Sequence, residues 1–302
     1  MRGILLSRRQ VAVLVLSVFV VSCASGRRRK VSVNPKPPEV ATAAPTIPRP
    51  LPFKPGEVLL YEVEFSKLIL SGTIGQIKLY VLPGQSDPRA SDGREIRTAA
   101  VAGTGVPSDI EFKAEASSKG FFTWLFGVKV NHVYDTLVSS QDLGLRSSVR
   151  TLEEGNARRE QRAVMDLANG VVTVTETDLV NKSSVPKVKT GASPRWVQDV
   201  LSAIYYLRSQ PLKEEQVLTI PISDQAQLYS IEVVAGKPEE VSVGAGKYSA
   251  TPVDVKMFDG RFVKRSGQLT VWLTDDPARL PVKAKLKLSG VTVTISLTAV
   301  KG

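Results

Sequence analysis

Cysteine and histidine are almost absent from this chain: its 302 residues include one of each, Cys23 and His132. A single cysteine cannot form a disulfide within the chain, so a buried apolar core must supply the stability. One histidine and one cysteine cannot build a metal site of the histidine–cysteine type, and we expect no metal and no cofactor. A catalytic triad is also not expected, because the sequence around His132 offers no evident partner.

A long hydrophobic run is missing too. The apolar stretch Val11–Val21 is about half the length that a membrane-spanning helix needs. Three arginines precede this stretch, and Val20-Val21-Ser22-Cys23 closes it. This pattern is typical of a bacterial lipoprotein signal, in which the cysteine thiol receives a diacylglyceryl group. We expect a signal peptide over residues 1–22 and lipidation of Cys23. Because Ala24 rather than aspartate follows, we expect an outer-membrane anchor with the protein facing the periplasm.

Positive charge is concentrated near the N-terminus. The net charge is +11, yet residues 56–302 hold 30 basic and 28 acidic side chains. A nearly neutral body gives no reason to expect a nucleic-acid partner. The basic cluster Arg27–Lys30 lies close to Cys23, where it favours contact with anionic lipid headgroups. A solvated linker is the simpler alternative. We therefore expect the membrane to be a partner through the lipid anchor and this basic segment.

Composition divides the chain into three parts. After the signal peptide, residues 23–55 are rich in proline and lack apolar periodicity, which predicts an extended, semi-rigid tether. From Gly56 onward the pattern has a period of two. Residues 282–288 alternate apolar side chains with lysines, and residues 291–297 alternate them with threonine and serine around the turn Ser289-Gly290. Such segments predict a β-hairpin. We expect residues 56–302 to form a single β-rich domain.

One segment departs from this alternation and predicts a helix. Ser193 followed by Pro194 is typical of a helix N-terminus. Apolar residues then recur at helical spacing up to Leu207, before Pro211. We expect an amphipathic helix of about four turns over residues 193–209. The predicted fold is mainly β: a large, strongly curled, open-barrel-like antiparallel sheet packed around this one long helix.

Three stretches resemble motifs of a known family. Residues 53–63 match F-x-x-G-E-x-L-x-Y-x-V, residues 199–208 match D-x-L-S-x-x-Y-x-x-R, and residues 271–282 resemble V-W-L-S-x-D-x-x-R-x-P-V. In this order, over about 250 residues, they resemble the bacterial domain of unknown function 3108. The resemblance implies export, a β-rich body and an envelope setting in bacteria with two membranes. It implies no reaction and no catalytic residues.

Aromatic residues make up 6% of the chain, but Phe121, Phe122, Trp124 and Phe126 gather within six positions. Packing in the core is the simplest interpretation of this cluster. The alternative is a lip over an apolar pocket, or a surface that meets lipid or a protein partner. On that alternative, these four residues are the candidate ligand-binding residues.

Together these patterns predict a membrane-tethered protein that is not an enzyme and that binds an apolar envelope molecule or an envelope protein. Two alternatives remain open: a structural envelope protein without a small ligand, and a hydrolase that uses His132 or Asp275. We expect Arg208 and Arg279 to lock the fold by pairing with Asp199 or Asp275 rather than to bind substrate.

The lipid anchor can be tested by Cys23→Ser. Without the thiol no lipid can be attached, so the variant should leave the membrane fraction or accumulate as an uncleaved precursor. Fractionation and intact-mass measurement would show this. An unchanged membrane fraction with an unchanged mature mass would contradict the anchor.

Overall fold

The computed structural model describes residues 46–68, 70–84, 109–120, 123, 127–258, 267–288 and 290–302. Cys23 and the four aromatic candidates Phe121, Phe122, Trp124 and Phe126 lie outside these residues. The lipid anchor and the pocket lip therefore stay predictions, as does the division of the chain into three parts. Only the last residues of the predicted tether are described, and there Ile47 and Phe53 are packed in the core.

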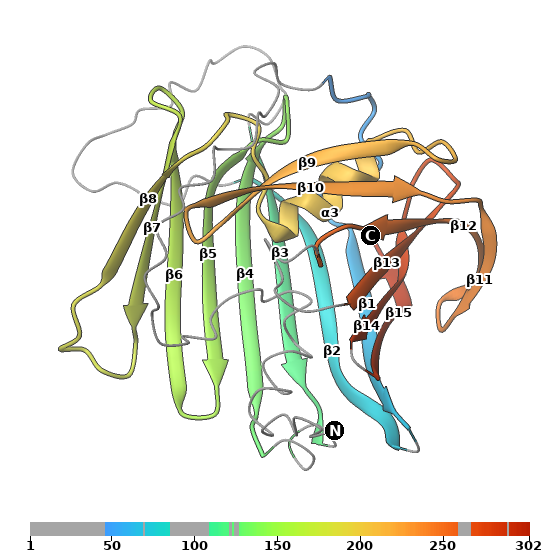
Figure 1. Ribbon diagram of the computed structural model, residues 1–302, viewed down its shortest axis with the longest axis horizontal. Helices are drawn as coiled ribbons and strands as arrows, with labels where there is room; N and C mark the ends of the chain where they lie inside the picture. Colours follow the sequence, from blue (N-terminus) through green and yellow to red (C-terminus); the bar gives the residue numbers. More distant parts are fainter. Residues whose placement is uncertain are drawn as a thin grey trace, which may run out of the picture.

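In the described part of the chain, fifteen strands form one antiparallel sheet (Figure 1). The strands are β1 (Val58–Lys67), β2 (Leu70–Pro83), β3 (Asp109–Ser118), β4 (Val130–Ser139), β5 (Leu145–Glu154), β6 (Ala157–Asp166), β7 (Val171–Asp178), β8 (Lys187–Ala192), β9 (Val217–Asp224), β10 (Gln227–Ala235), β11 (Glu239–Val243), β12 (Gly246–Val255), β13 (Gly267–Thr274), β14 (Pro281–Leu288) and β15 (Val291–Lys301). The predicted mainly β fold with a large antiparallel sheet is confirmed.

The order of the strands brings the two ends of the domain together. The sheet runs β8-β7-β6-β5-β4-β3-β2-β1-β15-β14-β13-β12-β10-β9, and β11 pairs with β12 beside this path. The first strand therefore pairs with the last near the middle of the sheet, while β8 and β9 form its two ends. The sheet does not close, and the strong open-barrel-like curl that the sequence predicts is not confirmed.

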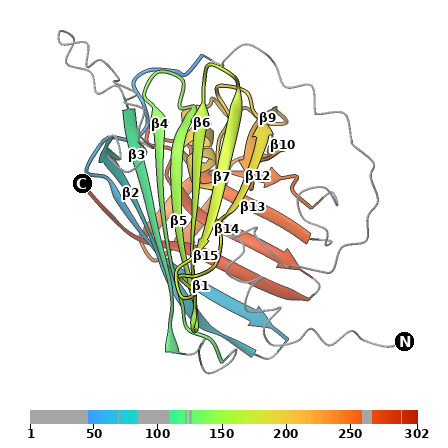
Figure 2. The same ribbon diagram turned by 90° about the vertical axis from the view of Figure 1, so that its left-hand side faces the viewer.

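The strands form two walls in space. Figures 1 and 2 show β3–β8 as one broad wall, with β12–β15 in a second wall at an angle to it. Strands β9 and β10 cross the upper end of the first wall. There, Leu145 of β5 and Val172 of β7 share a small apolar cluster with Ala226, which lies between β9 and β10. A second and larger apolar core joins buried residues of both walls, among them Tyr134 of β4 and Leu286 of β14.

The predicted hairpin at the end of the chain is confirmed. Strands β14 and β15 pair antiparallel, with Leu288 opposite Val291. Gly290 has a φ of +80°, a conformation that glycine adopts without steric cost. Along β15, apolar residues from Val291 to Leu297 are buried in alternation with half-buried threonine and serine. The period of two thus turns one face of the hairpin into the core.

The helix α3 (Val200–Ser209) begins later than the sequence predicts. Its N-cap is Asp199, not Ser193: the Asp199 side chain accepts from the Ser202 backbone N–H, and the Ser202 hydroxyl accepts from the Asp199 N–H. The residues of the predicted first turn are not helical, because the backbone of Gln198 hydrogen-bonds with Pro221 and Ser223 of β9. This pairing ties the chain to the sheet and shortens the helix to ten residues.

Two faces of α3 are apolar. On one face Tyr205 stacks on Phe112 of β3, with ring centroids 3.8 Å apart, and Phe53 meets Tyr205 edge-on at 5.2 Å. Leu201 lies in the same buried cluster and is 2% exposed. The other face carries Val200, Ala203, Ile204 and Leu207. A helix enclosed on both sides in this way must contribute much of the core packing.

Leu201→Ala should therefore lower the free energy of unfolding by about 2–5 kcal/mol, because the lost methyl groups leave a void in a closed core. Urea unfolding followed by circular dichroism would measure this. Leu68→Ala is the matched control, since Leu68 is 93% exposed. Equal stability of the two variants would mean that α3 packs only loosely against the sheet.

Candidate functional site

An apolar cavity lies beside α3, inside the larger core. Its volume is about 140 Å³, or about 1070 Å³ when all the space between the lining atoms and at the open mouth is included. It is bounded by α3 and by residues from eight strands, β1, β2, β9, β10, β12, β13, β14 and β15. An apolar cavity of about 150 Å³ inside a protein can stay dry and bind a molecule the size of benzene.

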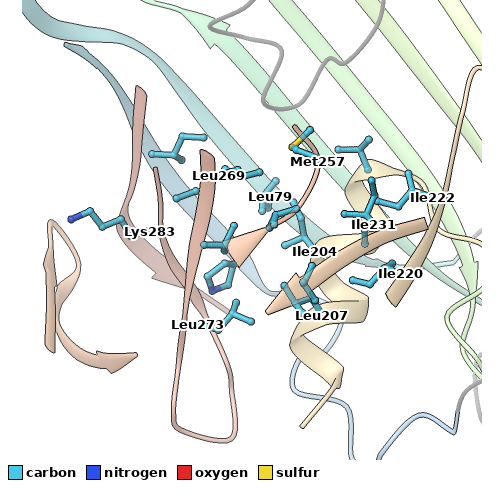
Figure 3. Close-up of a pocket in the computed structure, with 18 of the residues that line it drawn as sticks. Leu79, Ile204, Leu207, Ile220, Ile222, Ile231, Met257, Leu269, Leu273 and Lys283 are labelled. Carbon is cyan, nitrogen blue, oxygen red and sulfur yellow. The ribbon is translucent and has the colours of Figure 1, made fainter. Parts of the chain in front are cut away.

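Nearly all the lining side chains are apolar. Figure 3 shows Ile204 and Leu207 of α3 between side chains of β9 and β10 on one side and of β13 on the other. The lining residues are Tyr61, Ile77, Leu79, Val200, Ala203, Ile204, Leu207, Ile220, Ile222, Ile231, Val233, Val255, Met257, Leu269, Val271, Leu273, Pro281, Lys283, Ala284 and Ile295.

Two lining residues carry polar groups, and they behave differently. The Lys283 side chain points away from the other lining residues, and its ammonium lies 5.6 Å from the ring centroid of Trp272 (Figure 3). Tyr61 is 6% exposed, and its hydroxyl has no hydrogen-bond partner among the described residues. Burial raises the pKa of Tyr61 well above its ordinary value, although the Arg208 guanidinium lowers it. The Tyr61 hydroxyl has almost no accessible surface, so it does not face the open space of the cavity.

A buried ion pair lies at the C-terminal end of α3. Arg208 is fully buried, and its guanidinium donates to both carboxylate oxygens of Glu57, from Nη1 at 2.6 Å and from Nη2 at 2.9 Å. Its Nη2 also donates to the backbone carbonyls of Pro52 and Ala278, at 3.2 and 3.0 Å. A bidentate arginine–carboxylate pair with added carbonyl acceptors is the arrangement that best compensates a buried charge.

Aromatic rings enclose this ion pair. The Arg208 guanidinium carbon lies 5.3 Å from the ring centroid of Phe53 and 5.4 Å from that of Tyr205. Phe53 also meets Phe112 edge-on at 5.4 Å. The rings exclude water and add a cation–π attraction. Arg208 is thereby a structural residue held in one position, not a free cation.

The sequence-based choice of partners for the arginines was wrong. Arg208 pairs with Glu57 rather than with Asp199 or Asp275, and Arg279 donates to the backbone carbonyl of Gln210. Asp199 instead caps the N-terminal end of α3. These carboxylates and arginines still lock the fold, as expected, but through neighbours that spacing along the chain did not indicate.

A second buried polar cluster surrounds Arg150. Its Nη1 donates to Oδ1 of Asp224 at 2.7 Å, and its Nη2 lies 3.9 Å from Oδ2 of Asp199, which also accepts from Thr136. Burial raises the pKa of Asp224 above its ordinary value, and the Arg150 charge offsets part of that effect. The adjoining cavity is only about 20 Å³, enough for about one water molecule. This cluster holds β5, β9 and the start of α3 together.

The two residues of the hydrolase alternative, His132 and Asp275, do not lie at the apolar cavity. His132 is buried on β4 with Nε2 3.5 Å from Oε1 of Glu154, and the imidazole holds the pKa of that carboxyl below its usual value. Asp275 accepts from the hydroxyls of Ser249 and Thr251. Neither His132 nor Asp275 lines the cavity.

Among the residues that the structure describes, no group of three or more His, Cys, Asp or Glu side chains could hold a metal ion. No helix in the same ranges is long and apolar enough to cross a membrane.

Most of the cavity could not be recognised from the sequence. Its lining comes from positions between Tyr61 and Ile295, and only the helical contribution has a local signature. Val200, Ala203, Ile204 and Leu207 follow the spacing i, i+3, i+4, i+7 of one helix face. That signal predicts a buried face, but it does not distinguish a packed face from one that lines a cavity.

The fold and site define an antiparallel β protein with an apolar cavity between its sheet and one helix. Residues 89–298 match the model of a family described as protein of unknown function DUF3108. The match covers more than half of the chain, so this protein belongs to the DUF3108 family, and the predicted family is confirmed. The motifs at residues 199–208 and 271–282 lie within the match, and residues 53–63 precede it. None of the curated proteins compared with the chain matches it.

Several solved structures are similar at about 10% sequence identity. A β-barrel-like DUF1849 protein from Brucella abortus has a TM-score of 0.49, with 81% of this chain and 96% of that chain covered. A proposed exported protein with a YmcC-like fold from Bacteroides fragilis has a TM-score of 0.35, with 85% and 99% covered. A proposed lipoprotein from Parabacteroides distasonis has a TM-score of 0.30, with 83% and 97% covered.

Breaking the buried ion pair should be costly. Glu57→Leu leaves the Arg208 charge buried without its carboxylate and should destabilise the protein by about 3–5 kcal/mol. The double variant Glu57→Leu with Arg208→Met should lose less than the sum of the two single losses. Urea unfolding gives these values. Glu62→Gln is the control, because its pair with Lys119 is solvent-exposed and should be worth at most about 1 kcal/mol. Strict additivity would contradict the coupling.

Proposed function

We propose that this protein is a membrane-tethered envelope protein that binds an apolar molecule in the cavity between the sheet and α3, without catalysing a reaction. The observation that carries the proposal is the cavity itself: about 140 Å³ of space lined almost wholly by hydrocarbon groups. Water is poorly stabilised there because it finds few hydrogen-bond partners, whereas an apolar ligand gains both burial and dispersion contacts.

The placement of α3 supports this proposal. The helix contacts β3 and β4 on one side and β9 on the other, and the cavity lining runs from β1 to β15. In this proposal the sheet curls around α3 as an open barrel does, so that distant strands face one cavity. On the cavity face of the helix, Ala203 has a small side chain, and both Ala203 and Ile204 are only half-buried.

A binding role without chemistry fits the distribution of polar groups. The buried charged residues Arg208 and Arg150 have carboxylate partners outside the cavity. Catalysis by acid–base or nucleophilic groups needs those groups within hydrogen-bond reach of the bound molecule. Among the described lining residues, the Lys283 side chain points away from the cavity and the Tyr61 hydroxyl is enclosed, so neither polar group is in such a position.

The proposed location follows from the N-terminal segment. Lipid on Cys23 would anchor the chain to the outer membrane, and the part of residues 23–55 that precedes the packed Ile47 would hold the β domain away from the surface on the periplasmic side. An apolar envelope molecule would then be within reach of the cavity. A purely structural role is the second candidate, but a purely structural core gains nothing from an open apolar cavity.

Filling the cavity tests the proposal. Ala203→Phe places a ring in the space that a ligand would occupy, while Ala157→Phe adds the same ring at an exposed position on β6. The full chain is purified from cells without denaturation, and bound molecules are extracted and identified by mass spectrometry. We expect a defined apolar compound with the wild type and with Ala157→Phe, and about tenfold less of it with Ala203→Phe, because the added ring occupies the space of the ligand.

Circular dichroism and a thermal melt establish that both variants are folded. An identical amount of the same compound with Ala203→Phe would place its binding site elsewhere. Extracts with no enriched compound from any of the three proteins would favour the structural candidate.

A further inference from the structure

A second hollow lies on β13 and β14, separate from the apolar cavity. Its volume is about 240 Å³, and it is lined by Gln268, Thr270, Trp272, Lys285 and Lys287. The residues between these positions, such as Leu269, Val271 and Ala284, line the apolar cavity. Successive side chains of a strand point to opposite faces of the sheet. The hollow and the cavity therefore lie on opposite sides of the same two strands.

Four side chains that can donate hydrogen bonds meet at this hollow. Lys285 lies opposite Thr270 and Lys287 lies opposite Gln268, so a hydroxyl or an amide is the cross-strand neighbour of each lysine. The two lysines are two positions apart on β14, which is about 7 Å along a strand. Their long flexible side chains can therefore bring both ammonium groups to one anion, to which the hydroxyl and the amide can also donate.

The positive charge at this place is a row of three lysines rather than a single side chain. Lys283 precedes the other two at the next alternate position of β14. Their cross-strand neighbours on β15 all carry hydroxyl groups: Thr292, Thr294 and Ser296. The described residues give none of these three lysines an ion pair, whereas four other lysines each pair with a carboxylate: Lys113, Lys119, Lys187 and Lys256. Like charges this close repel one another, and an anion between them would remove that repulsion.

The nearest carboxylates are engaged by other partners or lie further away. Glu239 accepts from the indole Nε1–H of Trp272 at 2.6 Å, and Asp254 of β12 pairs with Lys256. Two further carboxylates belong to β1, which is separated from β14 by β15: Glu62 and Glu64. Two strand spacings are about 10 Å, a distance over which salt screens most of the attraction between exposed charges. The positive potential at the hollow is therefore largely uncompensated.

Trp272 gives the hollow an apolar wall that is held in place. Its indole edge is fixed by the hydrogen bond to Glu239, and the Lys283 ammonium lies 5.6 Å from the ring centroid. The side chain is half-buried, so part of the ring stays accessible. An indole offers a large contact area to the organic part of a ligand whose charged group is bound beside it.

The number of donors favours a phosphate group over a carboxylate. A phosphate monoester carries a charge of about −1.5 to −2 at pH 7 and presents three acceptor oxygens. Two ammonium groups, Lys285 and Lys287, match this charge, and the two neutral donors match the remaining acceptor capacity. A carboxylate has one negative charge and would leave one ammonium group without compensation.

We propose that the hollow on β13 and β14 is a binding site for a phosphate monoester. Lys285 and Lys287 pair with the phosphate, Thr270 and Gln268 donate to its oxygens, and Trp272 contacts the organic part of the ligand. This site is independent of the proposed binding in the apolar cavity, because it uses the opposite face of the sheet.

The indole N–H of Trp272 provides the readout. Labelling with 15N-tryptophan gives three indole signals in an NMR spectrum, because the chain has three tryptophans. Trp272→Phe and Trp196→Phe identify the signals of these two residues. Trp196 is 6% exposed and serves as the internal reference. Phenyl phosphate, inorganic phosphate and the neutral benzyl alcohol are titrated into the full chain at constant ionic strength.

The double variant Lys285→Gln with Lys287→Gln removes the charge of the hollow. Its matched control is Lys213→Gln with Lys237→Gln, which removes the same charge at two exposed positions outside the hollow. We expect phenyl phosphate to shift the Trp272 signal in the wild type and in the control, with about tenfold weaker binding to the double variant, because two charge-assisted hydrogen bonds are lost. Inorganic phosphate should bind more weakly than phenyl phosphate, because it makes no contact with the indole.

Two further probes identify the source of the phosphate group. Glycerol 3-phosphate and dihexanoyl phosphatidic acid, kept below its micelle concentration, carry the same phosphate monoester on a soluble molecule and on a lipid. Tighter binding of the lipid, lost in the double variant, assigns the site to a lipid headgroup. Equal binding of the two probes, also lost in the double variant, assigns it to a soluble phosphate ester.

The inference is overturned if phenyl phosphate binds equally to the wild type and to the double variant, if benzyl alcohol shifts the Trp272 signal as strongly, or if no phosphate probe shifts it. Thermal melts establish that the variants are folded. Lys287→Gln alone, at an exposed position, should give a smaller loss of affinity and replaces the double variant if that variant unfolds. None of these results decides the proposed binding in the apolar cavity, which the extraction experiment tests separately.

Discussion

The pair between Arg208 and Glu57 is the interaction on which the rest of the core depends. It connects α3 to the segment before β1, and the carbonyl of Ala278 adds the turn before β14. Glu57, Arg208 and Ala278 lie in the three stretches in which the sequence resembles the family. A buried guanidinium tolerates few other arrangements, because a lost partner leaves an uncompensated charge. The pair therefore fixes where the end of the helix lies against the centre of the sheet.

The two faces of α3 have different surroundings: one is closely packed, and the other lines the cavity. Leu201, Tyr205 and Arg208 lie on the face that is packed closely, with a stacked ring and a bidentate ion pair. Ala203 and Leu207 lie on the face toward the cavity. Because the first face is held rigidly, the second cannot move to fill the space beside it. The cavity is thus a consequence of how the helix is anchored.

Local patterns predicted the regular elements, and non-local contacts decided the rest. The β14–β15 hairpin follows from strict alternation around Gly290, and both of its determinants are close in sequence. The start of α3 was wrong because Gln198 pairs with β9, a contact that spacing around Pro194 does not contain. The partner of Arg208 was wrong for a similar reason, since Glu57 is 151 positions away. The cavity depends on side chains from eight strands, so no single motif encodes it.

The energetic cost of the cavity connects stability with binding. A closed, empty apolar cavity costs about 24 cal/mol for each Å³, so 140 Å³ gives at most about 3 kcal/mol relative to a filled core, because this cavity has an open mouth. That is a substantial part of the 5–15 kcal/mol that stabilises a typical domain. A ligand present at about one hundred times its dissociation constant returns about 2.7 kcal/mol. The cost of the empty cavity and the stabilisation by a bound ligand are therefore of similar size. A larger side chain at position 203 would fill the same space without a ligand. Under the proposed binding function, the space that costs stability in the empty protein is the same space that a ligand fills.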